Sequence, residues 1–280
     1  MERESIHVDR IHGTRSTMTT LLRASIALCG TTPLYDRKNA ARVLDALDAV
    51  GLTPQKAGLD ERSRDPLDRD ATLHLLAETP TAYPQTHLHL SRSARLKYSA
   101  SLALWDEAAL RVDFAPTPPP TEWRRIFELA DALAAVFQPD WGAAGIGFDL
   151  RENIRRPPAN ADELDADLIH ASTTLLGAEY ERAGPPGLGS RTYIGPFFAE
   201  QFGRERIETL PLPVEKLAWG GYRVDLVAEP WTAEIPALLE GWRRGMAHLR
   251  DADVLSRPVL DLGHVAGFKP AANLRLRSDV

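Results

Sequence analysis

Two histidines, His87 and His89, come closest in type and spacing to a reactive site. They belong to a stretch, Thr86–Leu90, that alternates like a β-strand, so both imidazoles are predicted to lie on one face. The two rings could bind one metal ion together, but a zinc site needs further ligands. His74 is the only other histidine nearby, and the sequence has no HExxH motif and no Cys/His pair. We expect exposed strand histidines, no metal and no cofactor. A metal-dependent or other hydrolase that uses His87, His89 and nearby carboxylates stays as the alternative.

Other motifs with a possible chemical role fail on their spacing. The glycines of WGAAGIG (141–147) have the order GxxGxG, and the residues after them cannot begin a helix that would hold a pyrophosphate. The segment GPPGLGS (184–190) lacks the Lys-Ser/Thr ending of a phosphate-binding loop. Ser190 is not part of a GxSxG motif, and Cys29 falls in a predicted core strand as a small apolar group. We therefore expect no catalytic residue.

Arg223, Asp225 and Glu229 share one face of a predicted strand over 222–229. Two carboxylates on one strand face could act as a general acid and a general base. The other face carries Tyr222 and further apolar residues, as in a strand with one solvated face. We therefore predict a solvated polar face. Together with the acidic run at 162–167, its residues are candidates for an interface.

The composition limits the class of protein. The 280 residues are 44% hydrophobic and 26% charged, which is typical of a globular protein with a sizeable core. A net charge of −6 argues against nonspecific nucleic-acid binding, which needs a cationic surface. A single cysteine cannot form an internal disulfide, so the cytoplasm is the expected compartment. Residues 1–17 are charged and contain no apolar run, so we expect a flexible arm and neither a signal peptide nor a membrane span.

The first half is predicted to contain both strands and helices. A buried strand is expected at Leu21–Leu28, and a helix begins at Asp36 and is capped by Gly51. Three consecutive prolines at 118–120 precede a second helix, which ends at Gln138 and Pro139. Further short strands are predicted between the two helices, at Leu73–Ala77, Thr86–Leu90, Leu96–Trp105 and Leu110–Phe114.

The second half is predicted to repeat this plan. Gly195 and Pro196 begin a short helix, and Gly220-Gly221 forms the turn of a hairpin between Leu217–Trp219 and Tyr222–Val227. A helix with an apolar stripe from Ile235 to Leu249 follows. Trp105 and Trp219 each precede a turn, a strand, a proline and such a helix. The alternative is that hairpin and helix recur by chance.

These patterns predict an α+β protein with antiparallel sheets and amphipathic helices packed on one face, in two similar βαββ-like halves. The expected organisation is an arm at 1–17, a first half at 18–150, a linker at 151–167, a second half at 168–258 and a C-terminal tail at 259–280.

Three segments carry a resemblance to a known family. They are GSRTYIGPFFAEQFG (189–203), LAWGGYRVDLVAEPW (217–231) and the helix ALLEGWRRGMAHL (237–249). In these, and in WRRIFELADALAAVFQPDWGAAGI (123–146), the chain resembles immunity protein family 52 of bacterial polymorphic toxin and type VI secretion systems, together with related myxobacterial-type proteins. The resemblance spans about residues 20–258. It depends on the placement of aromatic residues and glycines.

The resemblance implies a non-enzymatic cytoplasmic protein that binds and neutralises one cognate protein toxin, with no nucleic-acid or membrane partner. An interaction protein with another partner is the second alternative. Amphipathic aromatic side chains and charges on the predicted surface could form the interface. The candidate interface residues are Tyr193, Phe197, Trp219, Tyr222, Arg223, Asp225, Glu229 and Trp231.

Overall fold

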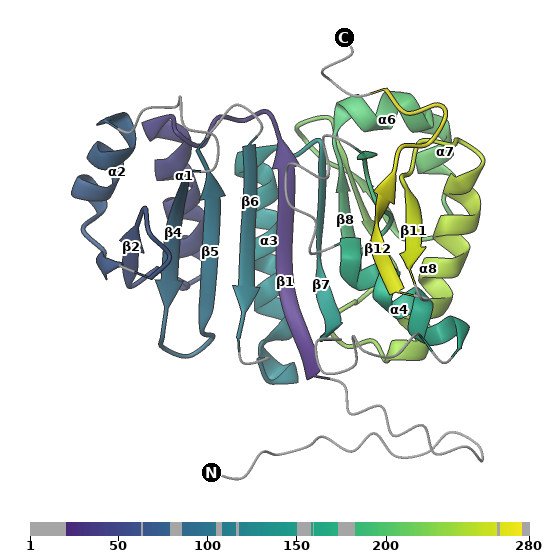
Figure 1. Cartoon of the computed structure of the whole chain (residues 1–280), viewed down its shortest axis with the longest axis horizontal. Coiled ribbons are helices and arrows are strands. Elements are labelled where there is room, and N and C mark those ends of the chain that lie inside the picture. Colours follow the sequence, from purple (N-terminus) through teal and green to yellow (C-terminus); the bar gives the residue numbers. More distant parts are fainter. Residues whose placement is uncertain are drawn as a thin grey trace.

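The computed structural model describes residues 21–62, 64–78, 86–104, 108–115, 118–149, 158, 160–172, 183–261 and 264–275. Ten strands form one antiparallel sheet in the order β3-β2-β4-β5-β6-β1-β7-β8-β10-β9 (Figure 1). The strands are β1 (Leu21–Gly30), β2 (Lys56–Gly58), β3 (Asp65–Pro66), β4 (His87–Arg92), β5 (Tyr98–Ala103), β6 (Ala108–Phe114), β7 (Trp141–Asp149), β8 (Arg191–Ile194), β9 (Val214–Lys216) and β10 (Tyr222–Asp225). A separate hairpin joins β11 (Arg257–Asp261) and β12 (His264–Lys269).

Helices α1 (Arg37–Ala49), α2 (Arg69–Glu78) and α3 (Trp123–Phe137) pack against the first part of the sheet. A short 3₁₀ turn, η1 (Pro120–Glu122), leads into α3. The Asp36 carboxylate accepts hydrogen bonds from the backbone of Lys38 and Asn39 and so caps α1. These elements confirm the helices predicted after Asp36 and after the prolines.

Helices α4 (Ala161–Ser172), α6 (Pro196–Phe202), α7 (Arg204–Glu208) and α8 (Ile235–Arg250) belong to the second half. They pack on the other face of the sheet, as two neighbouring residues of β8 show. Successive side chains of a strand point to opposite faces of the sheet. Tyr193 belongs to the core beneath α3, whereas its neighbour Ile194 belongs to the core beneath α8. Figure 1 shows α1 and α3 behind the strands and the β11–β12 hairpin in front.

The structure confirms the α+β class, the antiparallel pairing and the packing of helices on the sheet. The two halves contribute to one continuous sheet, and each half has its helices on one face. The division into an arm, two halves, a linker and a tail stays a prediction. Within it, α4 begins inside the range expected as a linker, and β11 and β12 occupy part of the range expected as a tail.

The predicted strand at Leu73–Ala77 is wrong, because this segment lies in α2. Asp68 caps the helix by accepting a hydrogen bond from the Ala71 backbone. Leu73 and Leu76 are buried one turn apart on the same helix face, while Leu75 is exposed. The predicted hairpin is present, but its first strand is β9 and residues 217–221 form the connection. Trp105 lies outside the described residues, so the repeat is not tested there.

Candidate functional site

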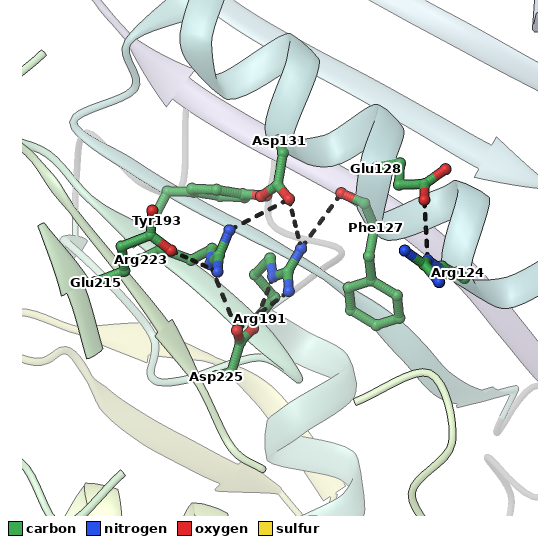
Figure 2. A network of polar contacts seen from close by, with 9 residues as sticks. All are labelled: Arg124, Phe127, Glu128, Asp131, Arg191, Tyr193, Glu215, Arg223 and Asp225. Carbon is green, nitrogen blue, oxygen red and sulfur yellow. Dashed lines mark hydrogen bonds and ion pairs between the residues drawn. The ribbon is translucent and has the colours of Figure 1, made fainter. Parts of the chain in front are cut away.

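A network of charged side chains joins α3 to strands β8 and β10 (Figure 2). Its centre is Arg191 on β8, whose side chain is only 3% exposed. Asp225 on β10 pairs with Arg191 across the strands, and Asp131 points down from α3. Three segments far apart in the sequence therefore meet at one guanidinium group.

The contacts of Arg191 use all three nitrogens of its guanidinium. Nε and Nη2 donate to the two carboxylate oxygens of Asp225 at 2.6 and 3.1 Å, a bidentate arrangement. Nη1 donates to Asp131 Oδ2 at 2.8 Å and to the carbonyl oxygen of Phe127 at 3.4 Å. The planar shape of the group thus fixes α3 relative to β8 and β10.

A second guanidinium extends the network toward the solvent. Arg223 lies 3.4 Å from Asp131, 3.5 Å from Asp225 and 2.6 Å from the exposed Glu215 of β9. The Tyr193 hydroxyl donates to Asp131 Oδ1 at 2.7 Å. Asp131 is 37% exposed, so it lies at the rim and Arg191 lies at the base.

Burial and charge act against each other in this network. Burial tends to lower the pKa of Arg191, but the hydrogen bond and charge of Asp225 and the charge of Asp131 together raise it, so the guanidinium stays protonated. Burial raises the pKa of Tyr193, and the nearby Asp131 carboxylate acts in the same direction. Burial also raises the pKa of Asp225, although Arg191 and Arg223 act in the opposite direction.

Two aromatic rings enclose Arg191. Its guanidinium carbon lies 5.2 Å from the centre of the Phe127 ring and 5.8 Å from that of Trp231. Trp231 follows β10 and also receives Arg124 at 5.9 Å. Such cation–π contacts are stabilising. The arrangement therefore links α3 of the first half to β8 and β10 of the second half.

The prediction of a solvated polar face on this strand is wrong for Asp225 and Arg223. Asp225 is buried and Arg223 is partly buried, because α3 and Asp131 lie over this face of the sheet. Glu229 is exposed and lies beyond β10, which ends at Asp225. Sequence reasoning missed Arg191 and Asp131. The one sequence signal for Asp131 is a charged residue at the edge of an apolar helix stripe.

The candidate interface residues occupy different positions. Tyr193, Tyr222 and Asp225 are buried, and the Tyr222 hydroxyl donates to Glu208. Phe197 and Trp219 are partly exposed and lie at the same end of the β8–β10 pair, where Ile194 is opposite Tyr222, while Glu229 and the partly exposed Trp231 lie beyond its other end. The structure thus brings Arg223, Asp225, Tyr193 and Trp231 into or against the network and leaves Phe197 and Trp219 outside it.

His87 and His89 lie side by side on β4, with ring centres 5.7 Å apart. Both are half-buried, so they are less exposed than expected. In the described part of the chain, no three His, Cys, Asp or Glu side chains form a group that could hold a metal ion. Desolvation lowers the pKa of His89, and the charge of His87 lowers it further.

This shift predicts a pH dependence of stability. The folded protein binds a proton at His89 less tightly than the unfolded chain, so the free energy of unfolding should fall as the pH drops below the ordinary histidine pKa. Because His89 is partly exposed, we expect a loss of less than about 1 kcal/mol between neutral and mildly acidic pH. Urea unfolding of His89→Gln at both pH values should show a smaller loss. An unchanged loss in His89→Gln would assign the effect elsewhere.

The remaining sequence candidates have structural positions. Cys29 is buried in β1, as predicted, and WGAAGIG forms the first part of β7. Ser190 is buried directly before β8. No helix among the described residues is long and apolar enough to cross a membrane.

Comparison with known proteins gives a likeness in fold. No family model matches this chain, and no curated protein matches it in sequence. Among solved structures, the chain is similar to the type VI secretion system (T6SS) protein PA0821 of Pseudomonas aeruginosa, with a TM-score of 0.50 and 13% sequence identity. The likeness covers 90% of this chain and 79% of PA0821. The α+β fold is thus one that a T6SS protein also has.

Proposed function

We propose that this chain is a non-enzymatic immunity-type protein that binds and neutralises a cognate bacterial toxin in the cytoplasm. One observation carries the proposal, namely the shared fold with a T6SS protein over 90% of the chain. Secretion systems that deliver toxins require proteins that protect the producing cell. A rigid scaffold that covers the surface of the toxin fits this role.

The ion-pair network supports the rigidity that such a role needs. Arg191, Asp131 and Asp225 fix α3 to β8 and β10 by charge-assisted hydrogen bonds. A binding surface that is already ordered loses little conformational entropy when a partner docks. The network therefore stabilises the scaffold that carries the interface. Its charged groups pair with one another and are not proposed to contact the toxin.

The surface that we propose for the toxin is the aromatic end, defined as Pro196, Phe197 and Trp219. Phe197 and Trp219 are partly exposed, and Pro196 is exposed. A Cβ at Gly221 would lie 2.2 Å from the Trp219 ring, so the indole packs closely on this backbone and is held in place. Fixed aromatic side chains of this kind are common anchors of protein interfaces.

The experiment is co-expression with candidate toxin domains taken from the genes that neighbour this one. We expect the chain to restore growth and to form a complex that isothermal titration calorimetry detects. The double variant Phe197→Ala/Trp219→Ala should lower the affinity at least about tenfold, as loss of anchoring aromatic residues does. Circular dichroism would show that the variant keeps its fold.

Leu260→Ala is the matched control, because Leu260 is an exposed apolar side chain on the β11–β12 hairpin. It should bind like the wild type. Absence of both rescue and complex formation would contradict the proposed function. Full binding by the Phe197→Ala/Trp219→Ala variant would contradict the choice of surface and leave the function standing.

A further inference from the structure

A cationic pocket lies at the other end of the sheet, beside the paired strands β2 and β4. It has a volume of about 250 Å³. Four basic side chains line it, together with the amide of Gln55 and the hydroxyls of Ser91 and Ser93. The basic residues are Lys56, Arg62, Arg64 and Arg92. In a chain with a net charge of −6, four cations around one pocket are a distinct feature.

Backbone pairing builds the wall of this pocket. Lys56 on β2 is directly opposite Ser91 on β4, so their side chains share a face. Gln55 donates its backbone N–H to the Ser91 carbonyl at 2.7 Å. The guanidinium of Arg92 donates to the carbonyl oxygens of Thr53 at 2.8 Å and Arg95 at 3.2 Å, which fixes its position.

The side chains that line the pocket offer more hydrogen-bond donors than acceptors. The side-chain oxygen of Gln55 accepts from both the N–H and the hydroxyl of Ser93 at 2.8 Å, so the amide nitrogen of Gln55 is left as a donor. Nη1 of Arg64 is buried without a hydrogen-bond partner among the described residues. A buried charged donor without an acceptor is unfavourable, and a bound anion removes this penalty.

The carboxylates of this region do not line the pocket. Asp60, Glu61 and Asp65 are close in sequence to Arg62 and Arg64, and all three are exposed. Asp60 accepts a hydrogen bond from the Arg62 backbone and so shapes the turn. Over the described range, the structure shows no ion pair of Lys56, Arg62 or Arg64 with a carboxylate. These three cations therefore have no direct ion-pair partner among the described carboxylates.

We propose that this pocket binds a phosphoryl group, as inorganic phosphate or as the phosphate of a small ester. Guanidinium groups donate in pairs to phosphate oxygens, and lysine adds a point charge. The Ser91 hydroxyl and the Gln55 amide nitrogen add neutral donors for a tetrahedral anion. The volume suits a phosphate with a small substituent, because pockets for larger ligands start at roughly 300 Å³. The proposal is independent of toxin binding and involves the opposite end of the sheet.

The test is isothermal titration calorimetry of the full chain with inorganic phosphate at low ionic strength. We expect saturable binding that weakens as salt is added. The double variant Arg62→Gln/Arg64→Gln should bind at least about tenfold more weakly, because it loses two charge-assisted donors. Arg244→Gln, at an exposed position on α8, removes a charge away from the pocket and should bind like the wild type.

Phenyl phosphate and succinate separate the sources of the anion. Tighter binding of phenyl phosphate than of inorganic phosphate would support an ester ligand, and the reverse order would support the free ion. Should the double variant unfold, Lys56→Gln provides the same test at an exposed position. The proposal is overturned by lack of saturable phosphate binding at millimolar concentrations, by an equal loss in Arg244→Gln, or by tighter binding of succinate than of phosphate.

Discussion

Asp225→Ala is expected to lower the free energy of unfolding by about 3–5 kcal/mol, because it leaves the Arg191 guanidinium buried without its main partner. Asp225 provides two of the hydrogen bonds of Arg191, at 2.6 and 3.1 Å, and both side chains are almost fully buried. Asp131 at the rim can compensate for part of the lost charge. Urea or guanidinium unfolding followed by circular dichroism measures the change.

Two further variants identify the cause of this loss. Arg191→Met/Asp225→Ala removes both charges, so we expect it to be less destabilising than Asp225→Ala alone. The exposed pair Arg204–Glu200, at 2.6 Å, is the surface control, and Arg204→Gln should unfold at nearly the same urea concentration as the wild type. Equal losses in Asp225→Ala and Arg204→Gln would show that burial of the network contributes nothing.

Gly241→Ala is expected to lower the free energy of unfolding by about 2–3 kcal/mol, although alanine is the better helix former. Gly241 lies on the buried face of α8, and a Cβ there would be 2.3 Å from the carbonyl oxygen of Leu226. That oxygen belongs to the backbone just after β10, so it cannot rotate away. The helix would have to move off the sheet. Thermal and urea unfolding measure the loss.

Gly245 on the same helix is the matched control. A Cβ there would meet the Cδ1 methyl groups of Leu188 and Leu212, at 2.5 and 2.6 Å. These methyl groups are the ends of flexible side chains, so they can shift. The higher helix propensity of alanine, worth about 1 kcal/mol relative to glycine, offsets part of the remaining strain. We expect Gly245→Ala to change stability by less than about 1 kcal/mol. A stabilised Gly241→Ala would mean that α8 does not approach the sheet as closely as described.

Asp225→Ala and Gly241→Ala both affect contacts of strand β10, one on each face of the sheet. The network holds α3 against β8 and β10 on one side, and Gly241 lets α8 approach the end of β10 on the other. Strand β10 is thus fixed from both faces near Asp225, at the end opposite the aromatic end that we propose as the toxin surface.

Local sequence patterns predicted most of the helices correctly. The helix that ends before Pro139 is α3, and the one with the apolar stripe from Ile235 is α8. In both, periodic burial agrees with the capping and proline signals, so one segment suffices for the prediction. Leu73–Ala77 was predicted wrongly, because a short run with leucines at 73, 75 and 76 fits a strand as well as a helix, and the Asp68 cap decides.

The candidate site could be predicted only in part. Asp225 and Arg223 stand out as charged residues on an alternating strand. A strand whose polar face is exposed to solvent has the same sequence pattern as one whose polar face is covered by a helix with a charged residue. The difference depends on Asp131, which is far away in the sequence and reaches the strand only because α3 packs beside it. The cationic pocket likewise combines residues from strands β2 and β4 with the loop that carries Arg62 and Arg64.

By itself, the sequence determined the α+β class and most of the elements, because hydrophobic period, caps and prolines act within short segments. Only the tertiary structure decided that both halves share one sheet, that their helices lie on opposite faces and that Arg191 is enclosed by Asp225, Asp131, Phe127 and Trp231. Strand order and burial of charge arise from contacts between distant segments, and no local pattern encodes which partner a buried side chain will meet.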